Sequence, residues 1–77
     1  MDYALSDEAQ CLAQAALADH PIASLRDLQV AKNKDRLLIS GRVRSFYHKQ
    51  MAQEVVRAVA TNWRVVNDVA VDDSALL

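Results

Sequence analysis

The stretch from residue 37 to residue 71 constrains the fold more than any other part of the chain. It opens with alternating apolar residues around Gly41, the only glycine, and continues with apolar residues at helical spacing as far as Ala60. A valine-rich stretch over residues 65–71 closes it. These periods predict a strand, an amphipathic helix and a second strand. A crossover of this kind is right-handed and joins parallel strands.

The residues before this stretch predict one more helix and one more strand. Apolar residues recur at helical spacing over residues 7–19, with Ser6 as the N-cap, and Pro21 ends the helix. Alternation over residues 25–31 predicts a strand. A polar turn joins it to a strand over residues 36–44, so the two strands should form an antiparallel hairpin.

The crossover helix is expected over residues 46–60, with Ser45 as its N-cap and Asn62 as a left-handed residue after its end. The last strand is expected over residues 65–72. Each helix carries one apolar stripe, so both helices should cover the same face of the sheet. The stripes consist of Ala9, Leu12, Ala13, Ala16 and Leu17 in the first helix, and of Ala52, Val55, Val56 and Val59 in the second. The sequence therefore predicts a single α+β domain over residues 1–77, in the order α-β-β-α-β, with a three-stranded mixed sheet.

Gly41 stands inside a predicted strand, where glycine is unfavourable without a reason. A ligand that approaches the backbone closely is one reason. The other is structural: a helix crosses the sheet where only a hydrogen atom fits, or a bulge needs a glycine's freedom. We favour the structural interpretation of Gly41.

The charges are unevenly distributed. The net charge of −1 gives no global attraction to nucleic acid or to anionic lipid. Residues 32–49, however, hold six basic residues against one Asp: Lys32, Lys34, Arg36, Arg42, Arg44 and Lys49. This group could hold anionic lipid headgroups, to which each basic residue near a charged membrane contributes about 1 kcal/mol. Alternatively, Arg42 and Arg44 pair across the sheet with Asp68 and Asp72, and the other basic residues form a solvated turn.

The residue types for catalysis or metal binding do not come together in the sequence. Cys11 is the only cysteine, so no intrachain disulfide can form. His20 and His48 are far apart in the chain and make a poor metal site without further ligands. We find no paired carboxylates, activated nucleophile or phosphate loop. We expect no enzyme activity, cofactor or metal.

Nothing at the amino terminus has the pattern of a secretory signal, and no apolar run approaches the roughly 20 residues of a membrane-spanning helix. We therefore expect no transmembrane segment. The expected location is the cytoplasm if residue 1 is the native start, and the periplasm or envelope if a leader was removed.

Two surface features could contact a partner. The sheet face away from the helices should carry Leu38, Ser40 and Ala70, and could serve protein–protein contact or homo-oligomerisation. Phe46, Tyr47 and Trp63 flank the second helix and could anchor the chain at a membrane interface. More often such residues close the ends of a small core, which is the interpretation that we favour here.

The ordered set of residues from strand to strand resembles the BON domain, a small α/β module of bacterial osmotic-shock and nodulation-type envelope proteins. The resemblance covers roughly residues 24–72. It rests on Leu37, Ile39, Gly41 and Val43, on Ser45 with Ala52 and Val55, and on Val65, Asn67, Val69 and Val71. The chain departs from the family pattern at Thr61-Asn62, where the family usually has Gly-Val.

The resemblance implies a non-enzymatic module that attaches to phospholipid surfaces or to other envelope proteins. Nucleic-acid binding is disfavoured on separate grounds. A KH-type clamp needs two glycines in a Gly-x-x-Gly loop, and an RRM-type sheet needs aromatic residues on its strands. The chain has one glycine, and its predicted strands carry no aromatic residue.

Overall fold

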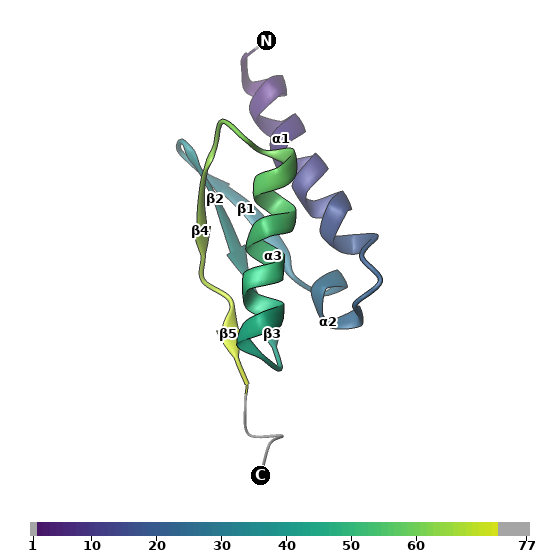
Figure 1. The fold of residues 1–77 in the computed structure, drawn as a ribbon. Coiled ribbons are helices and arrows are strands. Elements are labelled where there is room, and N and C mark those ends of the chain that lie inside the picture. The colour runs from purple at the N-terminus through teal and green to yellow at the C-terminus, as the bar shows by residue number, and fades with distance from the viewer. Residues whose placement is uncertain (1, 73–77) are drawn as a thin grey trace.

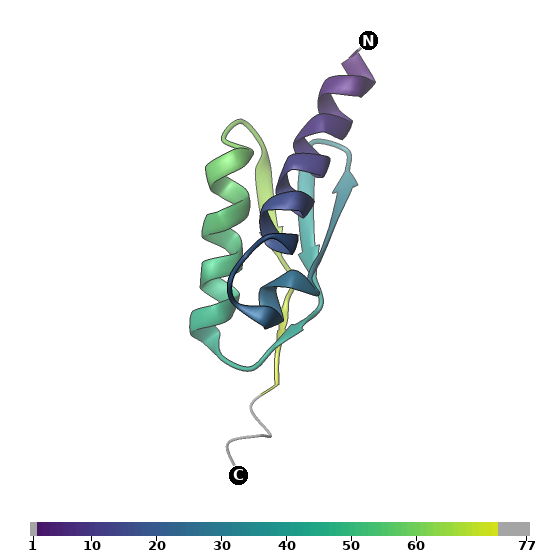
Figure 2. The ribbon, with the colours of Figure 1, turned by 90° about the vertical axis from the view of Figure 1, so that its right-hand side faces the viewer.

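The computed structural model describes the backbone of residues 2–72 and the side chains of residues 8–72. Its elements follow in the order α1 (Asp2–Ala18), α2 (Ala23–Arg26), β1 (Gln29–Asn33), β2 (Arg36–Ser40), β3 (Arg42–Val43), α3 (Phe46–Val59), β4 (Arg64–Asn67) and β5 (Ala70–Val71). The two long helices, α1 and α3, lie side by side over one face of the sheet (Figures 1 and 2). The predicted α+β fold, with both helices on one sheet face, is confirmed.

The sheet is mixed, as predicted. Its strand order is β1-β2-β4, with β1 and β2 antiparallel and β2 and β4 parallel. The short strands β3 and β5 form a second parallel pair. The backbone N–H groups of Asp68 and Ala70 donate to the carbonyls of Ile39 and Gly41, both at 2.9 Å. These bonds continue the ladder from the β2–β4 pair to the β3–β5 pair. The strand predicted over residues 36–44 is therefore one extended segment, interrupted between β2 and β3, and the last predicted strand is likewise interrupted between β4 and β5.

The interruption in the first of these segments falls at Gly41. Its φ of +130° is a conformation that L-residues with side chains rarely adopt. A Cβ at this position would lie 2.7 Å from Cδ2 of Leu28. The close neighbour of Gly41 therefore belongs to the segment between α2 and β1. The helix crossing that we expected at this glycine is not what confines it.

Several predicted boundaries are wrong. The first helix begins at Asp2, so Ser6 lies inside it and is not its N-cap. The strand predicted from Leu25 begins at Gln29, and Leu25 belongs to the short helix α2. Leu25 and Leu28 are both fully buried, and their spacing of three residues is that of a helical turn. Asn62 is not left-handed, since Lys34 is the only described non-glycine residue with a positive φ, at 60°.

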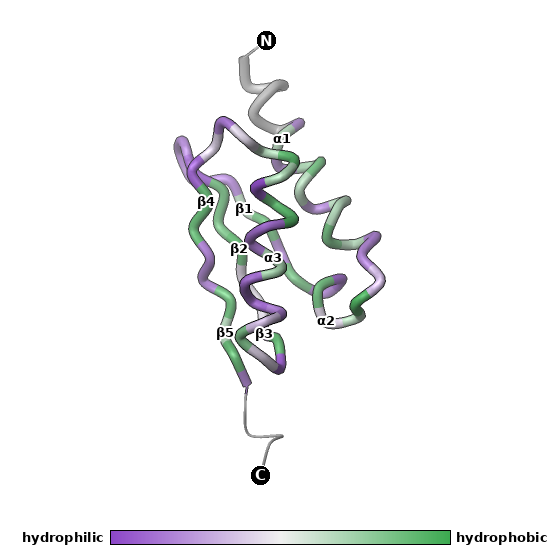
Figure 3. The backbone as a smooth tube through the Cα atoms, viewed as in Figure 1, coloured by the Kyte–Doolittle hydropathy of each residue, from purple (hydrophilic) through white to green (hydrophobic). Residues whose placement is uncertain are grey.

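The core lies between the sheet and the two long helices. It consists of Ala13, Leu17, Leu25, Leu28, Val30, Leu37, Ile39, Val43, Ala52, Val56, Ala60 and Val69. Figure 3 shows hydrophobic and hydrophilic segments alternating along α3, as expected of a helix with one buried side. Two predicted stripe residues, Leu12 and Val59, are 50% and 40% exposed. Neither side chain belongs to the buried core. Together with Trp63, they line a shallow hollow between α1 and α3.

Glutamine side chains of α1 hold the edge strand β1. The amide of Gln14 donates to the Leu28 carbonyl and accepts from the Val30 N–H, both at 2.8 Å. Gln10 donates to the Val30 carbonyl at 2.9 Å. These bonds satisfy backbone groups that would otherwise stand unpaired at the sheet edge, where another chain could add a strand.

Asn67 ties the end of β4 to the middle of α3. Its Nδ2 donates to the Lys49 carbonyl at 2.8 Å and to Oε1 of Gln53 at 3.3 Å. Its Oδ1 accepts from the Val69 N–H at 3.3 Å. The asparagine therefore fixes the distance between helix and strand and shapes the interruption between β4 and β5.

Candidate functional site

The six basic residues singled out in the sequence fall into two groups at opposite ends of the sheet. Lys32, Lys34 and Arg36 lie at the β1–β2 hairpin, and Arg42 and Arg44 lie at the β3–β5 end, where Lys49 follows in the first turns of α3. The six-residue separation of Arg36 and Arg42 corresponds to about 20 Å along an extended strand. The structure therefore does not bring the six residues into one cluster.

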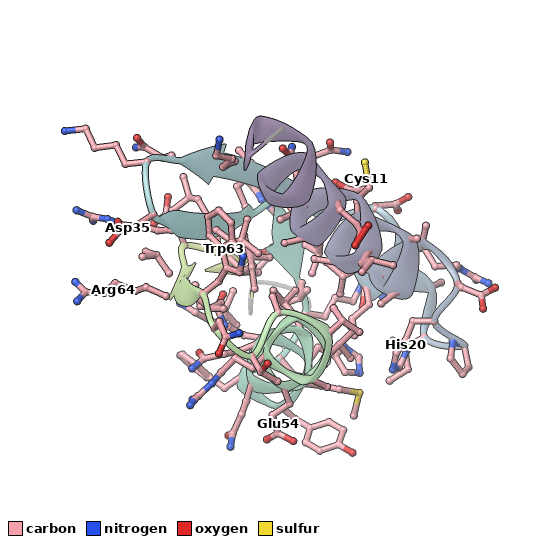
Figure 4. All side chains as sticks on the ribbon, turned by 90° about the horizontal axis from the view of Figure 1, so that it is seen from above. Cys11, His20, Asp35, Glu54, Trp63 and Arg64 are labelled. Atoms are coloured by element: carbon pink, nitrogen blue, oxygen red, sulfur yellow. The ribbon has the colours of Figure 1, made fainter. Side chains whose placement is uncertain are left out.

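The hairpin group gains a member that the sequence analysis missed. Arg64 opens β4 and is the register partner of Arg36 on β2, which in turn pairs with Asn33 on β1. Arg36 is held only loosely, with its Nε 4.0 Å from Oδ1 of Asp35 and both side chains well exposed. Figure 4 shows Asp35 and Arg64 pointing outward on the same side of the molecule.

The cross-strand ion pairing expected for Arg42 and Arg44 is not seen with Asp68. In residues 8–72, no ion pair joins either arginine to this aspartate. The register partner of Arg42 is Ala70, which carries no charge. Both arginines are exposed to solvent.

The aromatic residues do not act together as closures of the core. Trp63 is partly buried against the core and points inward (Figure 4), as the core-closing interpretation expects. Phe46 and Tyr47, in contrast, are 72% and 67% exposed, so this interpretation is wrong for them. We call Arg44, Phe46, Tyr47 and Lys49 the α3 tip: two consecutive exposed aromatic rings with a basic residue close on either side in the sequence.

Helix geometry explains why the two rings face solvent. Ser45 caps α3 by accepting a hydrogen bond from the His48 N–H at 3.2 Å, as predicted, and this fixes the helix start. The buried side of α3 is set by Ala52 and Val56. At 3.6 residues per turn, Tyr47 falls on nearly the opposite side of the helix and Phe46 at its flank.

The amino end of α3 adds positive charge at the α3 tip. The first turn of α3 contains no acidic residue, and the amino end of a helix carries partial positive charge. Phe46 and Lys49 line the same shallow hollow beside α3, which the oppositely charged Glu54 and Arg57 line as well. Arg44 and His48 line a second hollow on the side of α2, together with Asp27, an acidic residue close to the tip.

The second candidate surface is the sheet face away from the helices. Leu37 and Ile39 are buried toward α1 and α3, so Leu38 lies on the opposite face. We call this the uncovered sheet face. Its members on the three main strands and directly after β4 are Gln29, Ala31, Asn33, Arg36, Leu38, Ser40, Arg64, Val66 and Asp68.

The candidate metal ligands and the single cysteine do not come together in the part of the chain that the structure describes. Within residues 8–72, no three His, Cys, Asp or Glu side chains gather in a group that could hold a metal ion. Cys11 is exposed on α1, and His20, which follows the end of that helix, lies apart from it (Figure 4). Within the described residues, we find no helix with the length and the apolar character that a membrane span needs.

One comparison with known proteins identifies the family of the chain. The sequence matches the family model described as the BON domain over residues 9–73. A search of curated proteins gave no match.

Proposed function

Because the chain belongs to the BON domain family, we propose that it is a non-enzymatic binding module that attaches to anionic phospholipid surfaces through the α3 tip. Family membership supports a binding module in general, and association with the bacterial envelope. The observation that carries the proposal is the exposure of Phe46 and Tyr47 beside Arg44 and Lys49.

The chemistry of the α3 tip matches that of a membrane interface. Tyrosine places an apolar ring among acyl chains and its hydroxyl among headgroups, and phenylalanine adds apolar area. Arg44, which is exposed, and Lys49, which is half-buried, can meet lipid phosphates, since a basic residue near an anionic membrane contributes about 1 kcal/mol. Apolar burial and charge attraction thus act on the same few residues.

The hairpin group has a different role in this proposal. Its members Lys32, Lys34, Arg36 and Arg64 have none of the exposed aromatic residues of the described chain beside them, and Arg36 lies about 20 Å along the strand from Arg42. When the α3 tip touches a membrane, this group is beyond the screening length of about 8–10 Å at physiological salt. It then adds little to binding.

The test is co-sedimentation with vesicles of phosphatidylcholine alone and of phosphatidylcholine with phosphatidylglycerol. We expect binding only to the anionic vesicles, and weaker binding as salt is raised. The double variant Phe46→Ser/Tyr47→Ser should lose binding. The matched control Leu12→Ser/Val59→Ser, in the hollow between α1 and α3 away from the tip, should retain it. Equal binding by wild type and the tip variant would contradict the proposal.

A second candidate function is protein–protein contact through the uncovered sheet face. The observation that favours it is a row of apolar residues across the three strands, in which Ala31 pairs with Leu38 and Leu38 with Val66. No helix of the described chain covers this row (Figures 1 and 2).

A further inference from the structure

We propose that a second copy of this chain covers the uncovered sheet face, with the strands of the two copies antiparallel and Arg64 of each copy opposite Asp68 of the other. The inference rests on the second candidate function, protein contact through this face, and is independent of lipid attachment. It follows from the order of charges along β4 and the residue directly after it, and from the strand register.

The edge strand β4 carries a self-complementary pattern. Val65 and Asn67 face the helices, where Val65 packs on the core and Asn67 bonds to α3. Arg64 and Val66 therefore share the uncovered face. Asp68 directly follows β4, and its N–H still bonds to the Ile39 carbonyl. It is exposed while Val69 after it is buried, which places it on the uncovered face as well. The positive residue lies two positions before the valine and the negative residue two positions after it.

Consider a twofold axis that lies between the two sheets, perpendicular to the strands, at the level of Val66. Such an axis brings the charge pattern of one copy against the same pattern of the other copy in reverse order. It places Val66 on Val66 of the second copy, Arg64 on Asp68 and Asp68 on Arg64. A closed dimer of this type repeats every contact, so one pair of residues supplies two ion pairs. The two sheets would pack face to face at about 10 Å, a separation that arginine and aspartate side chains can bridge.

The neighbouring strands fit the same axis. Leu38 is the register partner of Val66, so it also meets its own copy across the interface. Arg36 comes opposite Ser40, which is uncharged and can accept a hydrogen bond. On β1, Ala31 is the partner of Leu38 and extends the apolar row.

The alternative arrangement with parallel strands is disfavoured by charge. An axis along the strands would place the arginine-bearing ends of both sheets together, so that Arg36 and Arg64 of one copy would face those of the other. Like charges placed together across an interface cost several kcal/mol. In the antiparallel arrangement the nearest like-charged approach is between Arg42 and the turn at Lys34, both highly exposed and so screened by solvent.

Sedimentation equilibrium of charge-swapped variants tests the arrangement. Arg64→Asp and Asp68→Arg should each weaken dimerisation about tenfold or more, because each substitution acts at two symmetric places. The double variant Arg64→Asp/Asp68→Arg should recover the wild-type dimer. Arg57→Asp, an equal charge change on exposed α3, should leave dimerisation unchanged. Circular dichroism checks that every variant is folded.

A wild-type chain that stays monomeric at millimolar concentration would overturn the proposal. So would a dimer that both single variants retain, since the contact would then lie on another surface. Dimerisation and vesicle binding should be lost independently of each other. The variant Phe46→Ser/Tyr47→Ser should still dimerise, and Arg64→Asp should still bind vesicles.

Cross-linking gives an independent readout of the axis. In a Cys11→Ser background, Val66→Cys should join two copies through a short thiol-reactive linker, because the two cysteines would face each other. The matched variant Ala58→Cys, exposed on α3, should not be joined under the same conditions. Equal cross-linking of both variants would contradict the proposed axis.

Discussion

Gly41 and Leu28 are packed so closely that a Cβ on the glycine would lie 2.7 Å from Cδ2 of Leu28. Leu28 is fully buried and comes just before β1, whereas Gly41 separates β2 from β3. The contact therefore fixes how the hairpin meets the β3–β5 end, where the α3 tip begins.

Substitution of this glycine should destabilise the fold. Gly41→Ala adds the clashing atom and forces a side chain onto a φ of +130°, so we expect the free energy of unfolding to fall by about 1–3 kcal/mol. Urea denaturation measures the change. In the double variant Gly41→Ala/Leu28→Ala the clash is relieved but the backbone strain remains. The double variant should therefore lose less unfolding free energy than the two single variants lose in sum. Strict additivity would show that the contact with Leu28 does not confine Gly41.

Gln14 should contribute to stability through hydrogen bonds at the sheet edge. Gln14→Glu keeps an acceptor for the Val30 N–H but places a carboxylate against the Leu28 carbonyl, which can only accept. We expect a loss of about 1–3 kcal/mol in urea denaturation, the cost of an unsatisfied polar group. Gln50→Glu, on an exposed position of α3, is the matched control: it loses only a 3.4 Å surface contact with Glu54, so the loss should stay at about 0.5 kcal/mol or less.

Asn67 should be required for the seating of α3 on the sheet. Asn67→Asp retains an acceptor for the Val69 N–H and loses the donor to the Lys49 carbonyl. We expect thermal unfolding at a lower temperature, with a loss of about 1–3 kcal/mol. Asn62→Asp, at an exposed turn position, provides the comparison. Equal melting temperatures for the two variants would mean that the bond to Lys49 adds no stability.

Lys34 occupies a left-handed conformation that glycine or asparagine adopts at lower cost. With its φ of 60° in the two-residue turn between β1 and β2, Lys34→Gly should stabilise the protein or leave it unchanged. Replacement of the neighbouring strand residue, Lys32→Gly, should instead cost about 0.5–1 kcal/mol. A clear loss of stability in Lys34→Gly would show that the lysine side chain makes a contact that outweighs its backbone strain.

Much of the fold could be predicted because its residues alternate or recur with clear periods. Leu37, Ile39 and Val43 are buried at every second position, and Ser45 caps α3 as expected. The short helix α2 was missed because it has a single turn and no side-chain cap, so Leu25 was attributed to the following strand. Such a turn is held by burial and not by local propensity.

The candidate sites depend on relations that the sequence does not display. Arg64 becomes a neighbour of Arg36 only through the parallel register of β2 and β4. The exposure of Phe46 and Tyr47 depends on which side of α3 meets the sheet. The positions of Ala52 and Val56 held a signal for this, since both aromatic residues lie off the stripe that those residues define.

The insertion of the α3 tip into anionic lipid can be measured most directly by moving the chain's only tryptophan. In a Trp63→Phe background, Phe46→Trp places the fluorophore on the tip and Val59→Trp places it at the other end of α3. We predict that anionic vesicles shift the emission of Phe46→Trp to shorter wavelength, that lipids brominated in their acyl chains quench it, and that Val59→Trp shows neither effect. An unchanged emission of Phe46→Trp in the presence of bound vesicles would contradict the account.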